Sequence, residues 1–313
     1  IAQVKRVAKR GSLDPRLVRV PAPLVDAVVV NPLQSQLTPT TVDPSGGYNP
    51  ALVGELRVPL DRIAPLPLDA RKVILRRAAQ ELRRGDVVNL GVGLPTELPV
   101  VALEEGMLDA VCFTNEHGIF GGLMGTAIGT TFVVALNPEA IMDSTFQFNY
   151  YDGGGLDITF LGVGQLDGNG NNNVSRFGTD IPGCGGFHNI TDRVRRIVFC
   201  TFFTAGGLDV AVEGGQLVIR REGKYPKFVE KIEQMTFNAA RAFANGQEVL
   251  YLTERAVFRL TADGLTLVEV APGVDVERDI RGRMGCALRI APDVAPMDLV
   301  LFRPDRLGLA ARL

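Results

Sequence analysis

A glutamate followed by glycine turns is the strongest candidate for chemistry in this sequence. Residues 114–122 read TNEHGIFGG, in which Glu116 follows an apolar run and precedes three glycines. A carboxylate at the end of a buried strand can act as a nucleophile, and glycines beside it leave room for a large substrate. A polar surface loop is the other interpretation of this stretch taken alone.

Two more glycine-rich turns are candidates, and the second of them, like the turn at Glu116, could bind an anion. Residues 89–95 read NLGVGLP, and residues 182–189 read PGCGGFHN. Backbone N–H groups without neighbouring side chains can reach an oxyanion or a phosphate. Neither turn has the glycine spacing of a dinucleotide-binding loop or the lysine of a P-loop, and each, taken alone, favours a structural turn.

Histidines and cysteines suggest no other catalytic centre. The chain has two histidines, His117 and His188, and four cysteines without metal-ligand spacing. We interpret both histidines as loop or hydrogen-bonding residues and expect no metal site. Cys184 lies inside a glycine-rich turn, but no neighbouring residue in the sequence would activate it.

The composition narrows the class of protein. The 313-residue chain is 46% hydrophobic and 22% charged, with a formal net charge of −2, which is typical of a globular protein. Because the charge is near neutral and no basic, aromatic patch is present, we expect no nucleic-acid partner. No apolar run reaches the roughly 18–20 residues that span a bilayer, so we expect no membrane segment.

The order of predicted elements indicates an α/β domain after residue 68. Residues 32–68 are rich in proline, threonine, serine and glycine, which predicts a linker. Helical spacing then begins at Asp69, with a predicted stop at Gly85. A strand that runs into a glycine turn, a helix and another strand follow, as in parallel α/β folds. We place these three elements at 86–90, 96–106 and 108–113.

The rest of the chain is expected to continue the sheet and to become richer in β-strands after Leu208. The predicted fold class is α/β, with an open, mostly parallel sheet flanked by helices. The remaining expected elements are short β-like runs within 17–31, strands at 131–136, 157–163 and 195–203, a hairpin turning at 213–215, three strands within 247–270 and a closing helix at 275–285.

The three glycine-rich turns fall at the carboxyl ends of predicted strands. Open α/β sheets bind their ligands at that edge. We therefore expect the three turns to meet in space, with Glu116 as the ionisable group at their centre.

Several long segments together resemble family I coenzyme A transferases. The likeness is to the single-chain acetate, propionate and acetoacetate branch, and it extends from about residue 1 to about residue 300. A match over several segments is more specific than any single motif. The segments are VVNLGVGLP, FTNEHGIFGG, FNYYDGGGLDITFLGVGQLDGNGNNNVSRFG, PGCGGFHNITDRVRRIVFCTFFTAGG and VLYLTERAVFRL.

The resemblance implies that Glu116 is the nucleophile. In this family the nucleophilic glutamate has an E-x-G-x-x-G context, which Gly118 and Gly121 complete here. By the same resemblance, these two glycines belong to the surface that binds CoA, where they keep side chains away from the acyl group and the pantetheine arm.

The resemblance also gives roles to the other two turns. Asn89 precedes Gly91 and Gly93, and corresponds to the asparagine that helps to hold the thioester region of CoA. Gly186, with Gly185 beside it, matches the double glycine whose backbone N–H forms part of the oxyanion hole.

The implied reaction is the transfer of coenzyme A between a short-chain acyl-CoA and a carboxylic acid. It is a ping-pong reaction through an acyl-glutamyl anhydride and a glutamyl-CoA thioester on Glu116. Coenzyme A is then a substrate, and no cofactor or metal is expected. Acetate, propionate, butyrate, lactate and acetoacetate all remain open as the acids exchanged.

The resemblance predicts a domain organisation with a partner. We assign residues 1–31 to the end of an N-terminal domain, 32–68 to the linker and 69–313 to the C-terminal domain with the catalytic glutamate. We expect the N-terminal half as a separate or processed chain in a cytoplasmic homo- or hetero-oligomer. The alternatives are a CoA-binding fragment or scaffold subunit without turnover, a weak acyl-CoA thioesterase, and a sugar-phosphate isomerase of similar fold.

Overall fold

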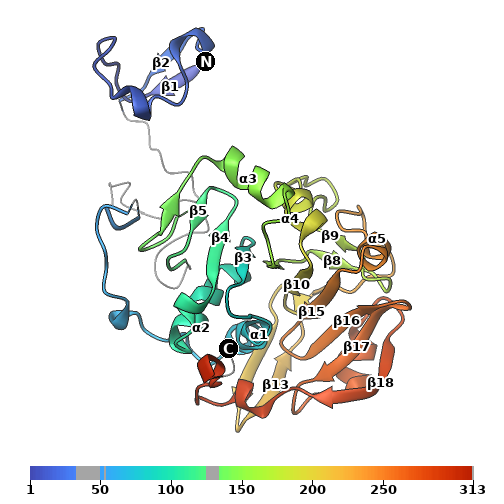
Figure 1. The fold of residues 1–313 in the computed structure, drawn as a ribbon. Coiled ribbons are helices and arrows are strands. Elements are labelled where there is room, and N and C mark those ends of the chain that lie inside the picture. Colours follow the sequence, from blue (N-terminus) through green and yellow to red (C-terminus); the bar gives the residue numbers. More distant parts are fainter. Residues whose placement is uncertain (33–49, 53, 125–133, 312–313) are drawn as a thin grey trace. The chain divides into compact units, whose positions relative to one another are not determined.

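The computed structural model describes residues 1–32, 50–52, 54–124 and 134–311. The chain divides into two compact units, Ile1–Tyr48 and Asn49–Leu313 (Figure 1). In the smaller unit, β1 (Ala2–Val4) and β2 (Val28–Val30) pair in parallel. The second strand lies within the β-like runs expected at 17–31, and its three valines are 50–52% exposed.

A ten-stranded sheet forms the centre of the larger unit (Figure 1). Five of its nine neighbouring strand pairs are parallel, and these include the run β15-β10-β7-β3-β4. The predicted α/β fold with an open, mostly parallel sheet is therefore confirmed. In spatial order the strands are β18 (Arg289–Pro296), β17 (Gly264–Val270), β16 (Ala256–Thr261), β15 (Glu248–Leu252), β10 (Arg196–Cys200), β7 (Ile158–Leu161), β3 (Val87–Leu90), β4 (Cys112–Asn115), β5 (Ile119–Phe120) and β6 (Ala140–Ile141).

Besides β1 and β2, three shorter strand pairs lie outside this sheet in the described part of the larger unit. The hairpin predicted to turn at 213–215 is confirmed, with Gly214 and Gly215 at positive φ between its strands. Such φ values suit glycine, which lacks a Cβ atom. The pairs are β8 (Gln165–Leu166) with β9 (Asn172–Asn173), β11 (Thr204–Ala205) with β14 (Tyr225–Pro226), and β12 (Asp209–Glu213) with β13 (Gln216–Arg221).

Helices cover both faces of the large sheet. The side chains of β10 alternate between two hydrophobic clusters: Val198 packs with α1 and α2, whereas Ile197 and Phe199 pack with α4 and α5. Strands buried on both faces are typical of parallel sheets. None of the described helices is long and apolar enough to cross a bilayer. They are α1 (Ala70–Ala79), α2 (Leu98–Glu104), α3 (Ser144–Asp152), α4 (Phe187–Arg193) and α5 (Ala239–Ala244).

The start of the first long helix agrees with its sequence signal. Asp69 is the N-cap of α1, and its side chain accepts a hydrogen bond of 2.9 Å from the Lys72 N–H. The helix ends at Ala79, earlier than the stop predicted at Gly85. That glycine instead lies at positive φ in the turn before β3, where its N–H bonds to the Ala110 carbonyl.

Three expected elements differ in the structure. Residues 108–110 form a 3₁₀ turn, so the strand predicted at 108–113 begins only at Cys112. Residues 131–133 lie outside the described residues, and the rest of the predicted strand at 131–136 contributes one isolated bridge, from Leu136 to Leu123. The closing helix predicted at 275–285 is confirmed only in part. Residues 276–283 are helical, but as a short π-helical turn followed by a 3₁₀ turn, and they do not close the fold, because the chain then returns to the sheet as β18.

Part of the segment predicted as a linker packs on the larger unit. The backbone of Val58 forms hydrogen bonds of 2.8 Å with both polar ends of the Asn137 side chain. The Leu66 N–H donates to the Glu104 carboxylate over 2.6 Å. Residues 58–66 are therefore held against the domain, whereas the assignment of the three domains stays a prediction.

Candidate active site

The sheet brings two of the three glycine-rich turns to the same edge. β3 pairs in parallel with both β4 and β7, so their carboxyl ends lie together. Glu116 comes directly after β4, and Gly91 directly after β3. The Gly91 N–H donates to the carbonyl of Phe160 in β7 over 2.7 Å, which fixes the start of its turn.

The turn after Glu116 is tight because the backbone of residues 139–142 lies against it. Gly118 has a φ of +100°, and a Cβ atom there would come within 2.0 Å of the Met142 carbonyl oxygen. Gly121 has a φ of +67°, and a Cβ atom there would meet the Glu139 side chain at 2.5 Å. Packing against backbone therefore requires a glycine at 118, whereas at 121 the positive φ is the main reason for glycine. The predicted contact of both glycines with CoA stays a prediction.

The Glu116 carboxylate is held in a partly buried position. The backbone carbonyl of Glu116 accepts a hydrogen bond of 2.7 Å from the Ser144 hydroxyl, which fixes the position of the residue. Its Oε2 atom is buried and has no hydrogen-bond partner among the residues that the structure describes. A carboxylate oxygen that is shielded from water and left unpaired is costly to the fold, and such groups are common at functional sites.

A buried polar cluster lies behind these strand ends. The Tyr151 hydroxyl is 2.8 Å from Thr114 Oγ1 and 3.4 Å from Asn89 Nδ2. The other end of the Asn89 amide accepts a hydrogen bond of 2.9 Å from Thr159. Burial raises the pKa of Tyr151 to about 12, and the charge of Glu116 adds to this rise. The phenol therefore stays neutral around pH 7, within electrostatic reach of Glu116.

Asn89 lies in this cluster and is fully buried. Both ends of its amide are used by protein groups, so the structure places the predicted CoA-binding side chain inside the sheet edge. The motif NLGVGLP gave no sign that the Asn89 amide is bound inside the protein, because its two partners are 62 and 70 residues further along the chain.

Helix α3 connects the Glu116 turn with the third glycine-rich turn. Its first residue, Ser144, bonds to Glu116, and its last turn carries Tyr151. Between them, the Phe148 ring lies against Gly186, where a Cβ atom would come within 2.6 Å of the ring. No helix was predicted at residues 144–152. The available signal was the helical spacing of Ser144, Gln147 and Tyr151.

Known proteins with similar sequences are CoA-transferases. No family model matches the chain. The chain is 41% identical over 314 residues to the caffeate CoA-transferase of Acetobacterium woodii. The alignment covers 99% of this chain and 59% of that protein. The chain is a CoA-transferase homologue.

Solved structures agree with this relationship. The crystal structure of the acyl-CoA transferase YdiF apoenzyme from Escherichia coli O157:H7 superimposes with a TM-score of 0.85 at 40% identity. That match covers 98% of this chain and 56% of YdiF, so the chain spans little more than half the length of these relatives. The acetate CoA-transferase subunit beta of Escherichia coli K12 is 29% identical and is covered over 97% of its length, together with 72% of this chain.

Two predicted site glycines of the CoA-transferase homologue lie in open space. Gly93 has a φ of +91° and Gly185 a φ of +52°, and a Cβ atom at either position would meet no other atom within 4 Å. A ligand could therefore approach the backbone at both turns. Gly185 adjoins Gly186, the N-cap residue of α4.

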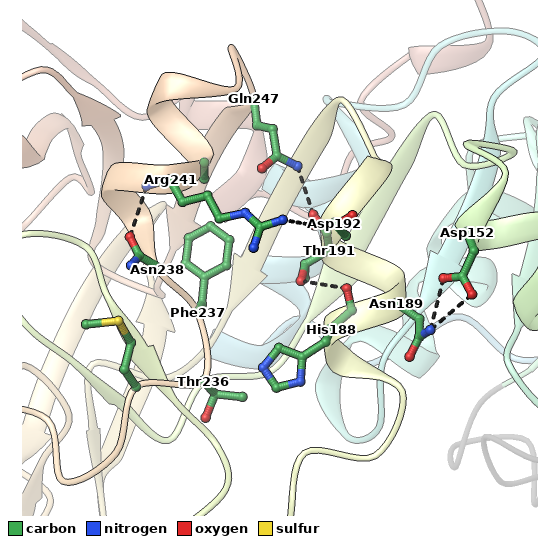
Figure 2. A pocket seen from close by; sticks show the side chains of 12 residues that line it. Asp152, His188, Asn189, Thr191, Asp192, Thr236, Phe237, Asn238, Arg241 and Gln247 are labelled. Carbon is green, nitrogen blue, oxygen red and sulfur yellow. Dashed lines mark hydrogen bonds and ion pairs between the residues drawn. The ribbon is translucent and has the colours of Figure 1, made fainter.

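A separate pocket of about 450 Å³ lies between α4 and α5 (Figure 2). Glu116 does not line it, although His188 does. Figure 2 shows that its polar side chains bind one another: Arg241 pairs with Asp192 at 2.6 Å, and the Asn189 amide donates to the Asp152 carboxylate. No group of three or more potential metal ligands is found in the described part of the chain.

Two alanine substitutions distinguish backbone strain from steric clash in this domain. We expect Gly93→Ala to cost about 1 kcal/mol of unfolding free energy, because its positive φ disfavours a side chain in otherwise open space. Gly118→Ala should cost at least about 2 kcal/mol more, because its Cβ would also collide with the Met142 carbonyl. Urea unfolding measures both. Equal losses would contradict the packing described around Gly118.

Proposed function

We propose that this chain carries the catalytic carboxylate of an enzyme that transfers coenzyme A between a short-chain acyl-CoA and a carboxylic acid. The observation that carries the proposal is the buried, unpaired Oε2 of Glu116 at the carboxyl end of β4, in a chain homologous to CoA-transferases. The acids exchanged are proposed to be of the acetate, propionate and acetoacetate type.

In the proposed mechanism, Glu116 first attacks the thioester carbonyl carbon of the acyl-CoA. The carbon–sulfur bond breaks, which gives an acyl-glutamyl anhydride and CoA thiolate. The thiolate then attacks the glutamyl carbonyl, forms a glutamyl-CoA thioester and releases the first acid as its carboxylate. A second carboxylate reverses these steps and leaves as the new acyl-CoA. An ionised carboxylate is already a nucleophile at neutral pH, so the attack needs no general base.

Each tetrahedral intermediate carries an oxyanion that requires a hydrogen-bond donor. We propose the backbone N–H of Gly186, next to Gly185, for this role. The support is its position: Phe148 of α3 packs on Gly186, and the same helix binds Glu116 through Ser144. Such a donor typically contributes about 3–4 kcal/mol to stabilising the transition state.

The proposed CoA surface consists of the glycine turns, with Asn89 supporting them from behind. Gly93 would let the thioester and the pantetheine arm approach the backbone, whereas Gly91, Gly118 and Gly121 pack against protein atoms and would shape the turns of this surface. The open space at Gly93 supports this assignment best. The Escherichia coli O157:H7 relative has been crystallised as a thioester complex with CoA, which supports the same class of intermediate here.

We also propose that turnover uses polypeptide beyond the described domain, as a partner chain or a second half in an oligomer. A CoA-transferase subunit of similar extent occurs among the relatives. The exposed valines of β2 offer an apolar strand for such a contact. The comparisons do not support a particular source for this polypeptide, so the N-terminal half stays a prediction, as does the cytoplasmic location.

Mass spectrometry of the intact protein tests the proposal. After incubation with acetyl-CoA, we expect one covalent CoA adduct per chain, mapped to the peptide that contains Glu116. Hydroxylamine should remove it, because it is a thioester. Addition of a second acid should discharge it into a new acyl-CoA. An adduct on another residue would contradict the proposal, as would no adduct in a preparation that transfers CoA. Acetyl-CoA binding without an adduct or transfer would indicate a CoA-binding subunit.

A further inference from the structure

A buried amide on α3 makes no hydrogen bond of good geometry with the described residues. Gln147 is fully buried, and neither its Nε2 nor its Oε1 atom has a hydrogen-bond partner in the described part of the chain. A buried amide with both ends unpaired destabilises a fold. A side chain kept at such a cost is a candidate for function.

The position of Gln147 on its helix points it toward the end of β4. Ser144, Gln147 and Tyr151 are spaced by three and four residues, so they share one face of α3. The first bonds to the Glu116 carbonyl at 2.7 Å, and the last to the Thr114 hydroxyl at 2.8 Å. Gln147 lies between these two contacts, on the face that packs against the strand end carrying Glu116.

The unpaired atoms of Glu116 and Gln147 are complementary as acceptor and donor. The Oε2 of Glu116 is a buried acceptor, and the Nε2 of Gln147 is a buried donor. The Gln147 amide faces the Tyr151 hydroxyl, where it acts as a weak hydrogen-bond partner that lowers the pKa of the phenol, although neither of its polar atoms reaches good hydrogen-bond geometry. The charge of Glu116 acts on the same hydroxyl and raises that pKa. By contrast, the neighbouring Asn89 amide already has a hydrogen-bond partner at each end.

We propose that Gln147 is a second catalytic residue, whose Nε2–H donates a hydrogen bond to Oε2 of Glu116 after rotation of the amide. The proposal rests on the function proposed above. When CoA thiolate attacks the glutamyl carbonyl, Oε2 becomes the oxyanion of the tetrahedral intermediate. The electron pair returns from this oxygen as the bond to the departing acid breaks. A fixed amide donor stabilises that charge, in addition to the N–H proposed at Gly186.

Gln147→Met tests this role, because it keeps the length of the side chain and removes the donor. We expect kcat for CoA transfer to fall about a hundredfold. The KM for acyl-CoA should not change, because the amide bonds to Glu116 and not to the substrate. Gln147→Glu should be slower still, because it places a second carboxylate beside Glu116. The melting temperature of Gln147→Met should change little, because the replaced amide makes no hydrogen bond of good geometry.

Asn172→Leu is the matched control. Asn172 lies on β9 and is also fully buried, with both amide atoms unpaired among the described residues. We expect its replacement to leave kcat unchanged. An equal loss of kcat in both variants would overturn the proposal, because the effect would then not be specific to the face of α3.

The assays distinguish failure of this inference from failure of the proposed function. They use the preparation that forms the Glu116 adduct, with its partner chain where one is needed. Wild-type protein without adduct or transfer would refute the proposed function. A wild type that transfers CoA, an inactive Glu116→Ala variant and a Gln147→Met variant with wild-type kcat would refute the role of Gln147 alone.

A high-resolution crystal structure of the glutamyl-CoA adduct gives a readout independent of turnover. We expect Nε2 of Gln147 within hydrogen-bond distance of the glutamyl carbonyl oxygen. A structure in which Gln147 bonds only to other groups would overturn the proposal, as would one in which a water molecule takes its place at that oxygen.

Discussion

Glu116→Ala is expected to abolish CoA transfer, with a fall in kcat of at least roughly a thousandfold. The reason is that the proposed covalent intermediates form on this carboxylate, and removal of a nucleophile leaves only the binding interactions. Glu116→Asp should retain some activity but lose about a hundredfold, because its shorter arm moves the attacking oxygen by about one methylene. Steady-state transfer assays and the mass of the CoA adduct measure both effects.

Asp109→Asn is the control for this pair. Asp109 is exposed in the turn before β4, so it lies at the opposite end of the strand that precedes Glu116. Its replacement should leave transfer unchanged. Near wild-type transfer by Glu116→Ala would remove the basis of the proposed mechanism, provided that the variant is folded by circular dichroism.

Arg255→Met is expected to give the largest loss of stability, about 3–5 kcal/mol of unfolding free energy. Arg255 is fully buried and pairs with Glu254 at 2.7 Å and with Glu222 at 2.6 Å. It also donates to the Asp279 carbonyl and lies over the Phe203 ring. Since Glu254 is fully buried as well, removal of the guanidinium leaves a carboxylate without its counter-charge.

Two further variants show whether the buried charge causes this loss. Addition of Glu254→Gln to Arg255→Met should recover part of the stability, because the unpaired charge is removed. Arg220→Met breaks an ion pair with Glu213 in which both side chains are about half exposed, and it should cost no more than about 1 kcal/mol. Urea unfolding measures all three. Similar losses for Arg255→Met and Arg220→Met would contradict the proposed cause.

Local signals were sufficient for much of the fold. The cap at Asp69, the strand before Gly91 and the hairpin at Gly214 depend on residues close together in the chain, and all three were predictable. The start of β4 at Cys112 was not, because the preceding apolar residues form a 3₁₀ turn. Their hydrophobicity reflects packing against the core, which the same residues could achieve in a strand or in a turn.

The candidate site was predictable in outline only. The place of Glu116 at the end of a strand followed from the apolar run and the glycines after it. The face of α3 that binds this turn was not predictable. Its polar residues are buried by contacts with residues 28 and 37 positions earlier in the sequence. A helix that buries polar side chains reverses the pattern by which helices are recognised.

The prolines of β18 made this strand difficult to predict, and they also protect the edge of the sheet. Pro292 and Pro296 have no N–H to donate, and both are exposed at the outer edge of the ten-stranded sheet, as is Asp293. An unprotected edge strand offers a row of free backbone groups on which another chain can build. With two donors absent and a charge between them, this edge resists the strand-by-strand association that leads to aggregates.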